Sequence, residues 1–182
     1  MSDRYMSRRR AVAAVALLAG GAAALRAAPA LAQGMDQTGG TTRFVRIAGV
    51  VSEFEVASGR LALQRSANPG VRGFAERMVK EHADILTSLK FTNDSNANAS
   101  MPRGLDRDTQ RMVDRLAATS GPDFDVLYMD MQVHTLEDVL VLYREYSRVG
   151  SVDSMKKYAV KWTPMIEQHG HHARTVRGSL GA

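Results

Sequence analysis

The 182-residue sequence contains no cysteine. That absence excludes disulfide bridges, metal sites built from thiolates, a cysteine nucleophile and a lipid anchor on an amino-terminal cysteine. A cysteine-free chain suits an oxidising compartment. The sequence also lacks the alternation of apolar and polar residues that is typical of strands, and it has no glycine-rich phosphate loop. These absences leave helices as the regular structure to look for.

The chain has little excess charge of one sign once its first segment is set aside. Its formal net charge is +5, but residues 1–32 carry five Arg and one acidic residue. The remainder has 19 basic and 18 acidic residues, a net charge of +1. No basic run with interleaved aromatic residues is left, so we expect no nucleic-acid partner.

Residues 1–32 are predicted to be an export signal. Three arginines at 8–10 precede an apolar run over 11–25, which is shorter than the roughly 20 residues that a membrane span needs. The tripeptide Ala-Leu-Ala at 30–32 fits a signal peptidase site, so we expect a periplasmic mature chain that starts at Gln33 and has no membrane span. The arginines suit either the general secretory or the twin-arginine route, and an uncleaved membrane anchor is the alternative.

A polar linker is expected over 33–42, followed by a helical-bundle domain over 43–178. Within the domain, apolar stripes of helical period predict long helices over 44–65, 71–91, 123–149 and 151–177, and a short one over 105–118. The clearest stripe has members four and three residues apart. They are Val71, Ala75, Met78, His82, Ile85 and Leu89.

These segments predict an all-α fold, a ferritin-like four-helix bundle. Short turns join the first two and the last two long helices, with Asn68 and Ser151 placed to cap the helices that follow. The connection between the second and third long helices, with its short extra helix, is long enough to run back along the bundle. Pro164 is expected to bend the last helix.

One carboxylate and three imidazoles are predicted to meet in the core, on four different helices. Glu55 and His82 lie about 13 and 14 residues from the turn that joins their helices, and therefore at one level. His134 and His169 lie 16 and 19 residues from Gly150, a mismatch of at most about one helical turn. The four side chains are thus expected to form one layer.

Such a layer could bind a single transition-metal ion, Zn, Cu, Ni or Fe. Asp138, His172 and Tyr128 are candidates for supporting contacts around the ligands Glu55, His82, His134 and His169. The chain has no Glu-x-x-His motif, so a di-iron carboxylate centre is not predicted.

Two other interpretations use the same residues. A hydrogen-bonded polar layer without metal could fix the register of the helices. The chain would then be a structural or interaction module of the cell envelope, with an envelope protein or a second copy as its partner. A redox enzyme that uses the site and Tyr128 is the third interpretation. No serine lies in a nucleophile context and no two carboxylates form an obvious acid–base pair, so binding is favoured over catalysis.

Several segments together resemble the bacterial DUF4142 family, whose members are often labelled as outer membrane proteins. The segments are EVASGRLAL at 55–63, VRGFAERMVKEH at 71–82, Phe124-Asp125 with Tyr128, Val133-His134, Tyr158-Ala159 and PMIEQH at 164–169. The resemblance covers about 44–177 and implies the bundle fold, export from the cytoplasm and the four polar core positions named above. It implies no defined activity. The family typically has Asp before its second-helix histidine, where this chain has Glu81.

Overall fold

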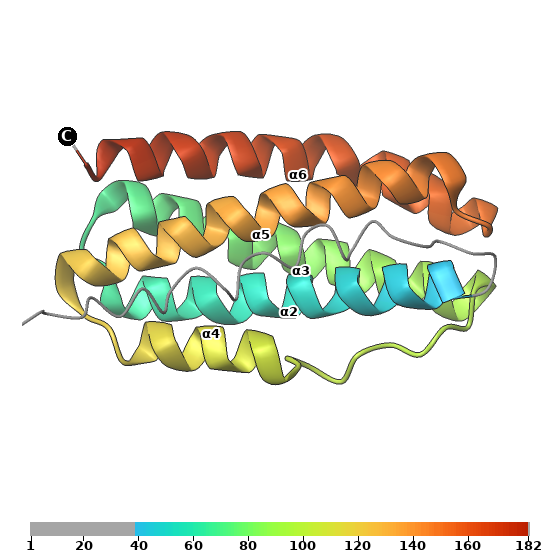
Figure 1. The fold of residues 1–182 in the computed structure, drawn as a ribbon, viewed down its shortest axis with the longest axis horizontal. Coiled ribbons are helices and arrows are strands. Elements are labelled where there is room, and N and C mark those ends of the chain that lie inside the picture. The colour runs from blue at the N-terminus through green and yellow to red at the C-terminus, as the bar shows by residue number, and fades with distance from the viewer. Residues whose placement is uncertain (1–38, 182) are drawn as a thin grey trace, which may run out of the picture.

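The computed structural model describes residues 39–181, and the regular structure in this range is entirely helical. Four long helices lie side by side, and a short one lies along the outside of the first (Figure 1). In chain order they are α2 (Gly39–Arg65), α3 (Pro69–Asn96), α4 (Arg107–Ala117), α5 (Gly121–Val149) and α6 (Asp153–Ser179). The predicted all-α bundle is confirmed. The predicted export signal lies outside the described residues.

Two antiparallel hairpins, α2–α3 and α5–α6, build the bundle. The connection from α3 returns along α2 and carries α4, so α5 begins at the same end of the bundle as α3 (Figure 1). This crossover packs tightly on α2, because a Cβ built on Gly49 would lie 2.5 Å from Pro102 Cγ. The return of the long connection, predicted from its length, is therefore confirmed.

The start of α3 is capped as the sequence predicts. The Asn68 side chain accepts hydrogen bonds from the backbone N–H groups of the second and third residues of α3, Gly70 and Val71, at 2.9 and 3.2 Å. Ser151 does not cap α6, because the N-cap residue is Val152 and makes no capping hydrogen bond through its side chain. The Ser151 hydroxyl is instead 3.1 Å from Thr41 Oγ1 of α2.

Two helix ends also differ from the prediction. Helix α2 begins at Gly39, so the last four residues of the predicted linker are helical. Helix α3 continues to Asn96, five residues beyond the predicted end, and the buried Asn93 side chain ties the following loop to it through hydrogen bonds with Ala99.

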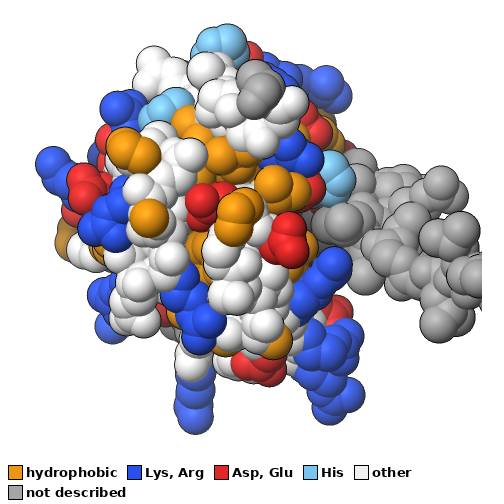
Figure 2. Space-filling view, turned by 90° about the vertical axis from the view of Figure 1, so that its left-hand side faces the viewer, with side chains coloured by type: hydrophobic (Ala, Val, Ile, Leu, Met, Phe, Trp, Pro, Cys, Tyr) orange, Lys and Arg blue, Asp and Glu red, His pale blue; other side chains and the backbone are white. Residues whose placement is uncertain are grey.

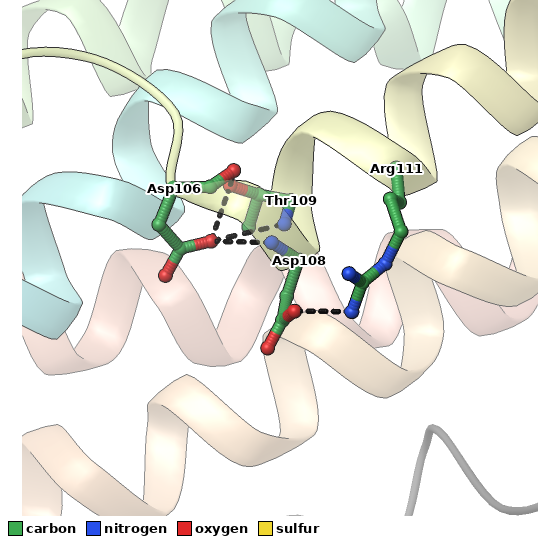
Figure 3. Close-up of polar contacts among 4 residues, drawn as sticks. All are labelled: Asp106, Asp108, Thr109 and Arg111. Carbon is green, nitrogen blue, oxygen red and sulfur yellow. Dashed lines mark hydrogen bonds and ion pairs between the residues drawn. The ribbon is translucent and has the colours of Figure 1, made fainter.

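The short helix α4 begins at a carboxylate cap (Figure 3). Asp106 Oδ1 accepts hydrogen bonds from the backbone N–H groups of Asp108 and Thr109, at 3.2 and 3.0 Å, and from the Thr109 hydroxyl at 2.9 Å. Partial burial by itself would raise the pKa of Asp106, but these hydrogen bonds prevail and lower it. Within the first turn of α4, Asp108 pairs with Arg111, which lies three residues further along. The cap fixes where α4 starts within the crossover.

The half of the core near the beginning of α2 is aromatic. Phe44 stacks on Tyr146 with ring centroids 4.1 Å apart, and it meets Tyr143 edge-on at 5.1 Å. The Tyr143 and Tyr158 hydroxyls are 3.1 Å apart, and Tyr158 donates onward to the carbonyl oxygen of Ile85 at 3.1 Å. The hydroxyls of these tyrosines are paired, as burial requires.

The surface carries both signs of charge. Figure 2 shows the end of the bundle where α3 and α5 begin, with Lys and Arg side chains interspersed with Asp and Glu and with hydrophobic side chains between them. Within residues 39–181, no helix has both the length and the apolar character needed to cross a bilayer.

Candidate functional site

The middle of the core contains a layer of polar side chains. Two contacts between α2 and α3 fix the register there. A Cβ built on Gly59 would lie 2.9 Å from Val79 Cγ2, and one built on Gly49 would lie 3.8 Å from Leu89 Cδ2. Because the helices are antiparallel, Glu55 and His82 lie at the same level between these contacts. Both side chains are buried, with exposed fractions of 0% and 1%.

Helix α5 adds Gln132 and Tyr128 to this layer, and both are fully buried. The Gln132 amide donates a hydrogen bond to Ser58 Oγ of α2 at 3.2 Å, which places Gln132 beside the α2 side of the layer. Burial raises the pKa of Tyr128, and the nearby Glu55 raises it further. The phenol therefore lies in the electrostatic field of the Glu55 carboxyl group.

Helix α6 adds His169, which contacts both the core and the rim. Its ring lies 5.3 Å from the His82 ring, measured between centroids. Its Nε2 atom hydrogen-bonds to Oε2 of Glu81, whose side chain is 27% exposed. The layer thus combines Glu55, His82 and His169 from three helices, with Glu81 at its edge.

The prediction that His134 belongs to this layer is wrong. His134 is exposed on the outside of α5, and the half-buried Asp138 lies near it. Burial raises the pKa of Asp138, and His134 partly offsets that rise. The two residues therefore interact on the outer face of α5 and not inside the core.

His134 is exposed because a different face of α5 packs into the core. The four–three spacing that predicts His134 in the core selects a stripe through Phe124, Leu127, Met131, His134, Asp138 and Val141. The buried face runs instead through Tyr128, Gln132, Leu136, Val139 and Tyr143. Phe124 and Met131 belong to both stripes. Elsewhere the buried residue is typically one position further along the helix than the predicted one, as Val139 is beside Asp138. Burying two tyrosines and a leucine removes more apolar area from water than burying a histidine and an aspartate, so the helix turns that way.

His172 lies near the layer without being part of it. It is half-buried, and its ring packs edge-on against Phe74 at 5.3 Å. Burial lowers its pKa, and the neighbouring Arg77 and His171 lower it further. A supporting role for His172 therefore remains a prediction.

Burial sets the protonation states in the layer. It raises the pKa of Glu55 from 4.5 to about 8, although Gln132 lowers it somewhat. Burial lowers the pKa of His82 well below its ordinary value, and His169 lowers it further. Burial also lowers the pKa of His169, against the opposing effect of Glu81. At neutral pH the layer therefore holds a protonated carboxyl group and two neutral imidazoles.

Many polar atoms of this layer have no hydrogen-bond partner within the protein. They are both carboxyl oxygens of Glu55, both ring nitrogens of His82, Nδ1 of His169, the Tyr128 hydroxyl oxygen and Oε1 of Gln132. Each unpaired buried group costs roughly 1–3 kcal/mol. Such a concentration suits a site that a cation or a small polar molecule completes. As the side chains stand, no three His, Asp or Glu side chains within 39–181 converge closely enough to hold an ion.

The family model for a domain of unknown function, DUF4142, matches residues 24–176. The chain belongs to the DUF4142 family. The resemblance noted in the sequence is thereby confirmed, and every residue of the polar layer falls inside the matched range of this DUF4142 protein. No curated protein and no solved structure matches the chain.

Sequence reasoning missed two residues of the site in this DUF4142 protein. Gln132 gave no signal, because a neutral amide on a helix is not a distinctive metal ligand. Glu81 did carry one, because a carboxylate stands immediately before a core histidine. What the sequence could not indicate is that Glu81 meets the histidine of another helix, His169, and not its neighbour His82.

Proposed function

We propose that this DUF4142 protein binds one divalent transition-metal ion in the middle of its bundle, through Glu55, His82 and His169. The observation that supports this most is the group of buried polar atoms without partners. Carboxylate and imidazole are ordinary ligands of such ions, and both imidazoles are neutral and so have a free electron pair.

Two imidazoles and one carboxylate suit zinc(II) or iron(II), which proteins hold with three ligands and leave open positions. Gln132 Oε1 and the Tyr128 hydroxyl, which have no hydrogen-bond partner within the protein, would be the groups to hydrogen-bond a water at such a position. The backbones of α2 and α3 already hold Glu55 and His82 at one level. Bringing the three ligands around an ion would therefore require rotation of side chains and no shift of these two helices. The role is binding or sensing of a metal and not turnover.

A metal-free polar layer is the second candidate function, and two observations favour it. The hydrogen bonds Gln132–Ser58 and His169–Glu81 already join helices across the layer. The ligand-type side chains also do not converge as they stand. In this case buried water would satisfy the remaining atoms and the layer would serve to fix helix register.

Metal content separates the two candidates. The untagged protein is purified, and its metals are measured by elemental analysis and by zinc(II) titration. We expect one ion per chain in the wild type, and its loss in His82→Ala and in His169→Ala. His134→Ala is the matched control, because this exposed histidine lies outside the layer and its removal should leave binding unchanged.

A wild-type protein that takes up no ion would contradict the metal proposal and favour the metal-free layer. Equal binding by His82→Ala would contradict it as well. We also propose that the ion is bound outside the cytoplasm. A chain beginning at Gln33 in the periplasmic fraction would support export, and an unprocessed chain confined to the cytoplasm would contradict it.

A further inference from the structure

Two consecutive residues of α3 face different surroundings. Neighbouring side chains on an α-helix point about 100° apart. His82 is accordingly buried in the core, whereas Glu81 lies at the rim between α3 and α6 with 27% of its side chain exposed. Glu81 is thus the polar group that joins the buried layer to the surface.

The partner of Glu81 is the ring of His169, not that of His82. Oε2 of Glu81 and Nε2 of His169 form a hydrogen bond. A carboxylate accepts hydrogen bonds and donates none, so Nε2 must be the nitrogen that carries the proton. In a neutral imidazole the other nitrogen, Nδ1, then has the free electron pair.

The other ring nitrogen of His169, Nδ1, lies on the side of the ring that is turned away from the rim. The two nitrogens of an imidazole point in widely different directions, so fixing Nε2 at the rim directs Nδ1 inward. Nδ1 is buried and has no hydrogen-bond partner within the protein. The His82 ring lies 5.3 Å from the His169 ring, measured between centroids. The atom available to a ligand on this side of the layer is therefore Nδ1.

We infer that Glu81 is a positioning residue of the buried site: it fixes the Nε2–H tautomer of His169 and directs Nδ1 toward the ion. The inference rests on the proposed function for the ion itself, but the effect on the tautomer exists without any ion. Carboxylates that orient a metal-binding histidine in this way typically contribute 10–100-fold to metal affinity.

The first experiment measures the tautomer in the metal-free protein. Long-range proton–nitrogen NMR spectra of the histidine-labelled protein distinguish Nε2–H from Nδ1–H. We expect Nε2–H at His169 in the wild type and a mixture of tautomers in Glu81→Ala. Glu81→Asp keeps a carboxylate and should restore Nε2–H. Glu76→Ala, which removes an exposed glutamate from the same helix, is the control and should match the wild type.

The second experiment titrates cobalt(II) and zinc(II) into the same proteins. We expect roughly 10–100-fold weaker binding by Glu81→Ala, and unchanged binding by Glu76→Ala. If the alanine variant does not fold, the nearly isosteric Glu81→Gln replaces it. Its amide permits either tautomer, so a loss in the same direction is expected.

The outcomes keep this inference separate from the proposed function. An unchanged tautomer together with unchanged affinity in Glu81→Ala overturns the positioning role and leaves the metal site in place. If the wild type binds neither ion, the proposed function fails, and the tautomer alone decides the role of Glu81. A shifted tautomer then supports that role and an unshifted one overturns it.

Discussion

At the scale of single residues, Glu55 lies in an unfavourable environment for a carboxyl group. It is fully buried on α2 and neither carboxyl oxygen has a hydrogen-bond partner. The protein responds by keeping it protonated, with a pKa of about 8. An ion that binds there must displace this proton, so zinc affinity should rise with pH up to about 8 and then level off.

Glu55→Gln should change how stability depends on pH. In the unfolded chain Glu55 ionises near its ordinary pKa of 4.5, whereas in the folded metal-free protein it ionises near 8. Between these values the unfolded state binds fewer protons, so the free energy of unfolding of the wild type should fall as pH rises from about 5 to 8. Glutamine cannot ionise, so the variant should lack this fall, which is on the order of 5 kcal/mol at most.

The measurement is urea unfolding of both proteins at several pH values with a chelator present. His82 has a lowered pKa, so its contribution to stability is lost as pH falls, but this loss is common to both proteins and cancels in their difference. Parallel stability curves for wild type and Glu55→Gln would show that the carboxyl group is not protonated in the folded state.

Single residues also show where sequence reasoning succeeds and fails. His82 was correctly placed in the core, because every other position of its stripe is apolar. His134 was not, because α5 offers two apolar stripes and the strict four–three spacing favoured the wrong one. A straight helix drifts about 20° per seven residues from that spacing, so the error grows along a helix as long as α5.

At the scale of elements, the two hairpins can be predicted from the sequence, but the way in which they pack against each other cannot. Turn residues such as Asn68 and Gly150 indicate where one helix ends and the next begins, and these signals are local. Which face of α5 packs against α2 depends on contacts between segments that are far apart in the sequence, such as Gln132 with Ser58. Three of the four predicted polar core positions, those on α2, α3 and α6, are buried in the layer.

The close approach of α2 and α3 at Gly59 gives a test of packing. Gly59→Ala would place a Cβ 2.9 Å from Val79 Cγ2 and 3.2 Å from the carbonyl oxygen of Ala75. We expect a loss of about 1–3 kcal/mol in the free energy of unfolding, since the helices must separate slightly. Because the same contact sets the level of Glu55 against His82, zinc affinity should fall too.

Gly73→Ala is the matched control for this substitution. Gly73 lies on the exposed face of α3, and a Cβ there meets nothing within 4 Å. Alanine should therefore stabilise the helix by about 0.5–1 kcal/mol, since glycine is the poorer helix former. Chemical unfolding measures both variants, and a Gly59→Ala protein as stable as Gly73→Ala would contradict close packing at this point.

At the scale of the whole molecule, the polar layer lies where the two hairpins meet. Glu55 and His82 belong to α2–α3, while His169 belongs to α5–α6. A ligand held by all three would bind the folded protein and not the unfolded chain. It would therefore raise the free energy of unfolding by mass action.

Zinc(II) at about 100 times its dissociation constant should add roughly 2.7 kcal/mol. For a domain of this size that corresponds to a rise in Tm of roughly 5–10 °C, reversed by a chelator. Thermal unfolding with and without zinc(II) measures the shift. His134→Ala should show the full rise and His82→Ala none, whereas an equal rise in both variants would place the ion elsewhere.

The crossover between α3 and α5 has a consequence for the order of assembly. Each hairpin is continuous in the sequence and is closed by a short turn, so each can form from nearby residues. Neither contains the complete set of Glu55, His82 and His169. Uptake of an ion would therefore come last, after the two halves have docked, and its release would accompany the first separation of the halves. The crossover joins the two halves covalently, and Pro102 packs it against α2 at Gly49. It would therefore limit how far the halves can separate.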